Sequence, residues 1–236
     1  MSDRRPDFLF LYRLILILIF GFYPKVTMDL HDYRQQYSAG SLGAEQLTAD
    51  PFELFQRLFF KAKENGMPEP NAMTLATADE NGADARIVLL KEVNGQSFVF
   101  FTNYNSAKGR QLAFNSHAAL LFWWHPIECQ VRIRGAVDKI SAIESDAYFL
   151  SRPHDSKAGA IVSAQSEIVK DYDDLIRKYE SLKALDDAQL VRPGHWGGYA
   201  LIPVEFEFWQ GRPNRMHDRF RYRLESGDWR IDRLSP

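Results

Sequence analysis

Residues 199–209 (YALIPVEFEFW) lead directly into residues 209–219 (WQGRPNRMHDR), and these two runs together decide the fold. The first run alternates apolar and polar residues, which predicts a half-buried β-strand. A glycine and a proline then indicate a turn. Arg215 and His217 are separated by one residue, so an extended backbone presents both on one side, beside Trp209. That face would suit a flat anionic ligand, and a surface hairpin with solvated arginines is an equally weighted alternative.

Composition limits the classes of protein that this chain can belong to. Its 236 residues, 45% of them hydrophobic and 25% charged, can bury the core of an ordinary globular protein. A formal net charge of −2 gives no general attraction to nucleic acid. The single cysteine, Cys129, excludes an internal disulfide and a cysteine-clustered metal site, so we expect a buried, inert thiol and no metal.

The N-terminus differs from the rest of the chain. Residues 8–23 (FLFLYRLILILIFGFY) are almost wholly apolar, yet they are shorter than the about 20 residues that a transmembrane helix needs. No small-residue cleavage site of a secretion signal follows them. We therefore interpret Met28 as the biological start and residues 1–27 as translated upstream sequence, with a membrane anchor and a secretion signal as alternatives. Residues 28–50 are then expected to form a mobile arm, and residues 51–236 one domain.

The patterning after Met28 predicts a mainly β protein with flanking helices. Asp50 is placed to cap a helix that runs to about residue 65, and Ser106 is placed to cap a second. At least seven strands separated by short turns favour an antiparallel barrel over a doubly wound sheet, and no dinucleotide or P-loop fingerprint is present. The expected strands are residues 73–78, 85–93, 97–103, 117–124, 128–140, 199–209, 219–225 and 228–233, and the expected helices are residues 50–65, 106–115, 143–151 and 171–185.

Two pairs of polar residues near the predicted barrel strands are candidate anion-binding sites. Arg86 and Lys91 bracket an apolar strand, but their odd spacing places them on opposite faces of a regular strand. Ser106 and Lys108 stand at a helix N-terminus, where free N–H groups and the helix dipole favour a phosphate. Plain capping, or solvated charges at a strand end, would explain the same residues.

A second phosphate site is indicated near residue 152. Tyr148 and Arg152 are four residues apart and share a helix face, Pro153 ends that helix, and Ser156 is placed to cap the next. An arginine-capped helix end remains the alternative. The polar run SAQS (163–166) that follows is unspecific by itself.

Taken together, these motifs resemble the pyridoxamine/pyridoxine 5'-phosphate oxidase family. The resemblance covers about residues 33–236. The R-P-x-D-S pattern within YFLSRPHDS and the R-x-H-D-R pattern of RMHDR are specific, and the short motifs are not. The matching motifs are RIVLLK (86–91), FFTN (100–103), SAK (106–108), ECQV (128–131), YFLSRPHDS (148–156), SAQS (163–166), WGG (196–198), EFWQG (207–211), RMHDR (215–219) and DWRIDRLSP (228–236).

This resemblance implies an FMN-binding split β-barrel, antiparallel and Greek-key-like, that acts as a homodimer with FMN at the interface. It implies that Arg86, Lys108 and Ser166 hold the FMN phosphate. Ala107 and Phe101 depart from the family, which commonly has Arg and Tyr there, so we expect somewhat weaker FMN binding. The positions that line the rest of the cofactor are implied to be Ile87, Val88, Leu89, Leu90, Lys91, Phe101, Thr102, Gln130, Gln165, Trp209 and Arg219.

The resemblance also implies the substrate contacts. Arg215 and His217 match a pair that lies over the pyridine ring and orients it, and these are the candidate catalytic residues. Arg34 and Tyr37 match an N-terminal arm that closes over the site. The implied clamp on the substrate phosphate consists of Lys91, Tyr148, Arg152 and Ser156.

The implied reaction is oxidation of pyridoxamine 5'-phosphate and pyridoxine 5'-phosphate to pyridoxal 5'-phosphate. A hydride leaves C4' for the flavin, dioxygen is reduced to hydrogen peroxide, and the amine substrate also yields ammonia. We expect a cytoplasmic enzyme without a nucleic-acid or membrane partner. Three alternatives remain: another split-barrel flavin reductase or haem-binding relative, a non-catalytic carrier of FMN or pyridoxal phosphate, and a membrane-tethered structural protein that would rest only on residues 8–23.

Overall fold

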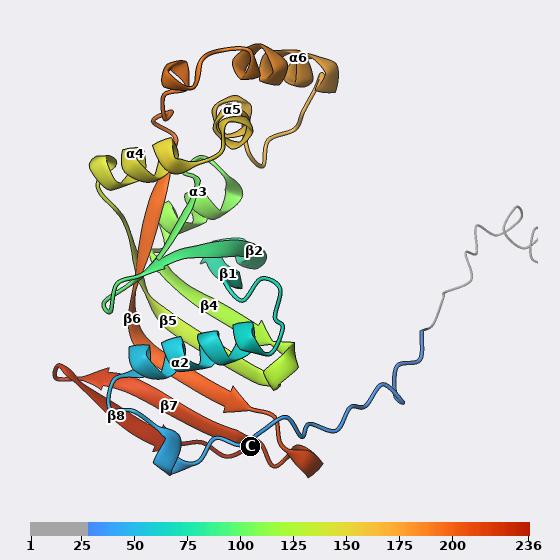
Figure 1. Cartoon of the computed structure of the whole chain (residues 1–236), viewed down its shortest axis with the longest axis vertical. Helices are drawn as coiled ribbons and strands as arrows, with labels where there is room; N and C mark the ends of the chain where they lie inside the picture. Colours follow the sequence, from blue (N-terminus) through green and yellow to red (C-terminus); the bar gives the residue numbers. More distant parts are fainter. Residues whose placement is uncertain (1–27) are drawn as a thin grey trace, which may run out of the picture. The chain divides into compact units, whose positions relative to one another are not determined.

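Eight antiparallel strands form one sheet in the computed structural model, which describes residues 28–236 (Figure 1). The strand order is β3-β2-β1-β4-β5-β6-β7-β8, and an additional pairing of β3 with β6 closes the first six strands into a barrel. The predicted mainly β, antiparallel barrel is therefore confirmed. The strands are β1 (Ala72–Asp79), β2 (Gly82–Val93), β3 (Phe98–Asn103), β4 (His117–Trp124), β5 (Cys129–Lys139), β6 (Trp196–Gln210), β7 (Asp218–Glu225) and β8 (Asp228–Arg233).

The chain divides into two units, Met1–Gln35 and Gln36–Pro236, and the second holds the barrel. This unit begins earlier than the expected domain start at residue 51. Leu42 is buried, and its N–H donates to Asp218 Oδ2 at 3.2 Å. The apolar extension predicted at residues 1–27 lies outside the described residues. Within the described part, no helix is both long and apolar enough to cross a bilayer.

Helix α2 (Pro51–Glu64) forms as its sequence predicts. The Asp50 side chain accepts the N–H of Phe52, and proline occupies the first helical position. The buried rings of Phe52 and Phe55 lie 5.4 Å and 5.0 Å from Phe98 of β3. The helix thereby contributes an aromatic layer to the barrel core.

Three helices are inserted between β5 and β6, and they lie at the opposite end of the barrel from β7 and β8 (Figure 1). We expected a helix after Pro153, capped by Ser156, but the sequence did not indicate its bounds. Pro153 occupies the N-cap position of this helix, so Ser156 lies within its first turn and is not the cap that we expected. The helices outside the barrel are α3 (Ala107–Phe114), α4 (Ala142–Ser151), α5 (His154–Val162) and α6 (Tyr172–Lys183).

Candidate active site

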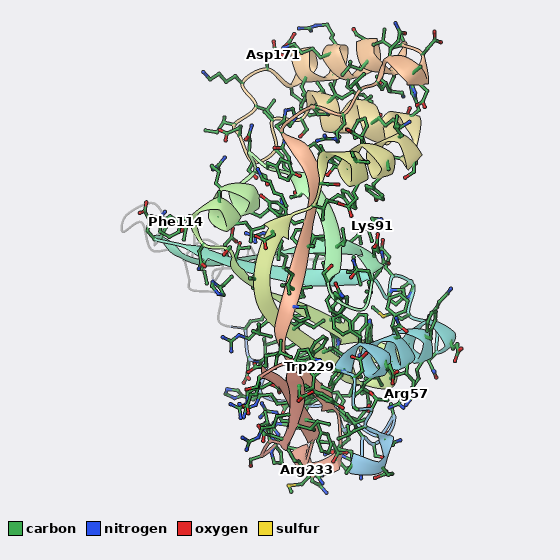
Figure 2. All side chains as sticks on the ribbon, turned by 90° about the vertical axis from the view of Figure 1, so that its left-hand side faces the viewer. Arg57, Lys91, Phe114, Asp171, Trp229 and Arg233 are labelled. Carbon is green, nitrogen blue, oxygen red and sulfur yellow. The ribbon has the colours of Figure 1, made fainter. Side chains whose placement is uncertain are left out.

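A cavity of about 680 Å³ is lined by residues of β2, β3, α3, α4 and α5. Figure 2 shows Lys91, one of its lining residues, beside the barrel strands. The cavity brings together most of the residues that were predicted for the flavin and for the substrate phosphate. These are Arg86, Ile87, Val88, Leu89, Lys91, Phe101, Thr102, Lys108, Tyr148, Arg152, Ser156 and Gln165.

One end of the cavity is built on the N-terminus of α3. The Ser106 hydroxyl accepts the N–H of Gly109 at 3.3 Å, and a Cβ at Gly109 would lie 2.1 Å from a backbone oxygen, so the turn requires glycine there. Lys108 is buried, and its Nζ donates to Gln165 Oε1 at 3.0 Å. Burial, and then the charge of Arg86, lower the pKa of Lys108. An anion placed here would relieve this unfavourable accumulation of positive charge.

Arg86 lies at the edge of the same end and is held by its neighbours. Its Nη1 donates to the carbonyl of Leu75 at 3.1 Å and to the hydroxyl of Thr77 at 2.6 Å. Its Nη2 donates to Gln111 Oε1 at 3.0 Å and to the carboxylate of Asp84. The guanidinium therefore has a fixed orientation before any ligand arrives.

The other end of the cavity contains an unsatisfied cation. Arg152 stacks 4.7 Å above the ring of Trp196, and its Nη1 is buried without a hydrogen-bond partner in the described structure. Burial lowers the pKa of Arg152. Tyr148 and Phe101 stack beside it with ring centroids 3.8 Å apart. A buried donor without an acceptor is unfavourable, so this end fits an anionic ligand such as a phosphate.

A charged cluster that the sequence analysis missed fixes α5 behind this end. Lys157 is 1% exposed, and its Nζ donates to both carboxylate oxygens of Asp187 at 3.0 Å and 2.8 Å. His154 contacts the same carboxylate at 3.1 Å, and this hydrogen bond raises the pKa of His154. Ser156 is positioned between these two residues of α5. No sequence signal could have paired residues 154 and 157 with residue 187, because the pairing depends on the folded loop.

A second group of residues lies outside the cavity. It joins three predicted residues to Trp123, which was not predicted. We call Tyr37, Trp123, Trp209 and His217 the aromatic cluster. Trp209 and His217 have ring centroids 4.5 Å apart, and Tyr37 lies 5.6 Å from Trp209. Trp123 lies 6.1 Å from Trp209. Gln130 faces Trp209 across β5 and β6. Within one chain, the cluster and the cavity are separate sites.

A backbone hydrogen bond determines which ring nitrogen of neutral His217 carries the proton. The N–H of Arg212 donates to His217 Nδ1 at 3.1 Å, so in the neutral ring the proton is on Nε2. Burial, followed by the charges of Arg215 and Arg219, lowers the pKa of His217. Asn214 and Arg215 have positive φ values of 56° and 62°. Two consecutive left-handed residues are costly, and such strain gathers at functional sites.

Arg219 is already occupied by protein contacts. Its Nε and Nη2 donate to Glu207 Oε1 at 3.0 Å and 2.8 Å, and its Nη1 donates to the carbonyl of Ser235. Glu207 is buried, so the pair is partly shielded from solvent. Arg219 therefore presents a fixed charge beside Trp209, its cross-strand neighbour.

The remaining predicted residues take three different places. Leu90 is buried in the hydrophobic core and does not line the cavity. Ser166 follows Gln165 with a positive φ of 74° and does not line the cavity. Arg34 belongs to the unit Met1–Gln35. The functional roles of all three remain predictions.

The closed antiparallel barrel and its cationic cavity define the chain as an FMN-binding split barrel. PhzG from Burkholderia lata 383, solved with tetrahydrophenazine-1-carboxylic acid, superposes with a TM-score of 0.78 at 30% identity. This match covers 81% of this chain and 95% of that one. A pyridoxamine 5'-phosphate oxidase-related, FMN-binding protein from Nostoc punctiforme has a TM-score of 0.64 at 15% identity, over 78% of this chain and 96% of that one, and supports the fold alone.

Sequence comparison identifies the family more narrowly. Residues 60–185 match the family description "Pyridoxamine 5'-phosphate oxidase", and residues 196–236 match "Pyridoxine 5'-phosphate oxidase C-terminal dimerisation region". The chain belongs to the pyridoxamine 5'-phosphate oxidase family. The pyridoxine/pyridoxamine 5'-phosphate oxidase of Salinibacter ruber is 49% identical over 88% of this chain and 99% of its own length. The protein of that name from Cupriavidus necator is 51% identical, also over 88% and 99%.

Proposed function

We propose that this chain oxidises pyridoxamine 5'-phosphate and pyridoxine 5'-phosphate to pyridoxal 5'-phosphate, with FMN as cofactor and dioxygen as electron acceptor. One observation carries the proposal: a single cavity has an incompletely paired cation at each end, the buried Lys108 and the half-buried Arg152, whose Nη1 has no partner in the described residues. A phosphorylated cofactor and a phosphorylated substrate would each satisfy one of them. Bound FMN would supply the acceptor for the hydride that leaves C4' of the substrate.

At the flavin end, Lys108 and Arg86 would hold the phosphate of FMN. The N-terminus of α3 adds its free N–H groups and the positive end of the helix dipole. Thr102 and Gln165 line the wall between this end and the rest of the cavity. Their side chains are joined by a hydrogen bond of 3.3 Å, so they provide polar contacts in a fixed arrangement.

At the substrate end, Arg152 would donate from Nη1 to a phosphate oxygen. Ser156, in the first turn of α5, and Lys91, on β2, line the same cavity and add a hydroxyl and a second cation. The rings of Trp196 and Phe149, whose centroids lie 4.7 Å and 5.8 Å from the guanidinium carbon of Arg152, restrict Arg152 to this orientation. Binding energy from the phosphate would thereby position the pyridine ring of the substrate.

We further infer a homodimer in which the aromatic cluster of one subunit completes the cavity of the other. The match of residues 196–236 to a dimerisation region supports this arrangement, since that segment carries Trp209 and His217. Neutral His217 would then donate its Nε2–H toward the substrate, and Arg215 would add a charge beside it. FMN at the interface, hydrogen peroxide as product and a cytoplasmic location belong to this proposal.

Two measurements on the purified protein test the proposal. We expect mass analysis of the released flavin to give FMN rather than FAD, at about one per chain, because one mononucleotide phosphate site is present. We expect oxygen uptake when pyridoxamine 5'-phosphate or pyridoxine 5'-phosphate is added. A flavin-loaded protein without oxygen uptake would instead be a carrier, and FAD as the main flavin would contradict the assigned phosphate site.

A further inference from the structure

A carboxylate lies directly against the cations at the flavin end of the cavity. Asp84 and Arg86 are two residues apart on β2, so both side chains are on one face of the strand. The Asp84 carboxylate accepts from Arg86 Nη2 and, at 3.4 Å, from Gln111 Nε2. The hydrogen bond from Gln111 and then the charge of Arg86 lower the pKa of Asp84 against the opposing effect of desolvation. Asp84 is therefore ionised at neutral pH.

This contact occupies the part of Arg86 that a phosphate would use. Both Nη atoms of Arg86 donate to protein acceptors, and Asp84 is the only charged one among them in the described structure. Leu75, Thr77 and Gln111 supply the neutral acceptors. Only the Nε–H is left without a partner among residues 28–236. A phosphate that approaches the Nη face must displace Asp84 or accept its repulsion.

The charge of Asp84 also reaches the second cation of this end. Asp84 raises the pKa of Lys108, against the larger lowering by burial and by Arg86. The side chain of Asp84 is 48% exposed and that of Arg86 is 18% exposed, so Asp84 can turn toward solvent while Arg86 stays in place. Ala107, at the start of α3, adds no charge that would offset the carboxylate.

We propose that Asp84 is an internal counter-ion that competes with the flavin phosphate for Arg86. It thereby sets how strongly the protein prefers FMN to riboflavin, which lacks the phosphate. This inference rests on the proposed function, because it needs the flavin phosphate at Arg86 and Lys108. It predicts that removing the carboxylate strengthens FMN binding, whereas removing a binding residue would weaken it.

The test compares FMN and riboflavin binding to flavin-free protein by quenching of flavin fluorescence. We expect Asp84→Asn to tighten FMN binding about five- to twentyfold, because it removes the repulsion between the carboxylate and the flavin phosphate. Riboflavin binding should stay unchanged, because riboflavin has no phosphate. Glu80→Gln is the matched control. Glu80 lies in the turn before β2, is exposed and has no ion pair in the described chain, and the substitution removes the same charge.

The outcomes separate this inference from the proposed function. Wild-type protein that binds no FMN would contradict the proposed function itself. Wild-type protein that binds FMN, with Asp84→Asn equal or weaker, would overturn the inference and make Asp84 a residue that orients Arg86. An equal gain in Glu80→Gln would overturn it as well, because net charge alone would then explain the effect. A second variant, Asp84→Ser, must bind FMN more tightly than the wild type as well. Thermal unfolding checks that it is folded.

Discussion

The cavity and the aromatic cluster differ in whether their polar groups already have protein partners. In the cavity, Lys108 is buried, and the Nη1 atom of Arg152 is buried without a hydrogen-bond partner among residues 28–236. Beside the aromatic cluster, Arg219 is paired with buried Glu207, and the imidazole of His217 is fixed by a backbone N–H. The cavity therefore gains free energy when an anion binds, whereas the cluster is complete before any ligand arrives. We infer that the first region supplies affinity and the second supplies orientation.

The largest expected effect tests the affinity assigned to the cavity. Arg152→Ala should raise the KM for pyridoxamine 5'-phosphate about ten- to a hundredfold, because a charge-assisted contact contributes roughly 1.5–3 kcal/mol. The FMN content should stay near that of the wild type, because Arg152 is assigned to the substrate phosphate alone. Steady-state oxygen uptake and the flavin absorbance ratio measure the two quantities.

Arg177→Ala is the control for this substitution. Arg177 lies on α6, its side chain is 66% exposed, and it does not line the cavity. We expect neither KM nor FMN content to change. A loss of flavin from Arg152→Ala with an unchanged KM would reverse the assignment of the two ends of the cavity.

The second prediction asks whether the two regions meet across a dimer. One chain carries Arg152→Ala, and the other carries Arg215→Asn with His217→Ala, because asparagine tolerates the left-handed backbone at position 215. Random reassembly after mild denaturation should restore activity to about a quarter of the wild type, since half of the dimers are mixed and each of these has one intact site.

Each variant alone, taken through the same reassembly, is the control. At a substrate concentration near the wild-type KM, the expected result is low activity in both, with recovery only in the mixture. If the mixture stays as inactive as its components, the cavity and the aromatic cluster of the same chain must serve one site. The inference that the cluster of one subunit completes the cavity of the other would then be wrong.

A smaller effect is expected from crowding the aromatic cluster. A Cβ at Gly211 would lie 2.7 Å from Cβ and Cγ of Tyr37, so Gly211→Ala should displace this ring. We expect a loss of roughly 1–3 kcal/mol in stability from overpacking, with a reduced kcat and unchanged FMN content. Thermal unfolding and oxygen uptake measure these changes. Gly194→Ala is the control, because its Cβ would meet no atom within 4 Å. If Gly211→Ala leaves both the melting temperature and kcat unchanged, Tyr37 has no role at this position.

The elements that sequence patterning predicted are those with local signals. Helix α2 has its cap and its first-turn proline, and β6 has its alternation, so both were placed to within a few residues. Closure of the barrel depends on pairing β3 with β6, about a hundred residues apart, and no local pattern reveals that register. The start of helix α5 was placed too late, at a cap on Ser156, because a proline can precede a helix as well as end one.

In the candidate site, too, the residues with a local sequence signal could be predicted and their tertiary partners could not. Arg86, Lys108 and Arg152 could be named because motifs carry them, and the structure gathers them in one cavity. The partners of these residues could not be named. Asp84 contacts Arg86 through the geometry of β2. Asp187 reaches Lys157 only after the segment between them, which contains helix α6, has folded. Charged pairs of this kind depend on tertiary structure, so patterning cannot locate them.

The smallest predicted effect compares His154, which lies behind the substrate end of the cavity, with His217 of the aromatic cluster. The hydrogen bond to Asp187, followed by the carbonyl of Lys183, raises the pKa of His154 above 6.5. Burial, and then Arg215 and Arg219, lower that of His217 below 6.5. The stability contributed by His154 is therefore present below pH 6.5 and lost as the pH rises through its folded pKa.

His217 should show the opposite dependence, because its folded pKa is depressed. Its contribution to stability is present above pH 6.5 and lost as the pH falls through the folded pKa, since the unfolded chain then binds the proton more readily. We expect melting temperatures of the wild type and His217→Gln to converge at low pH and to differ above pH 6.5, with the reverse for His154→Gln. The kcat/KM of the wild type should fall as His217 becomes protonated. Parallel pH profiles for the two variants would contradict the separate environments on which the comparison of the two regions rests.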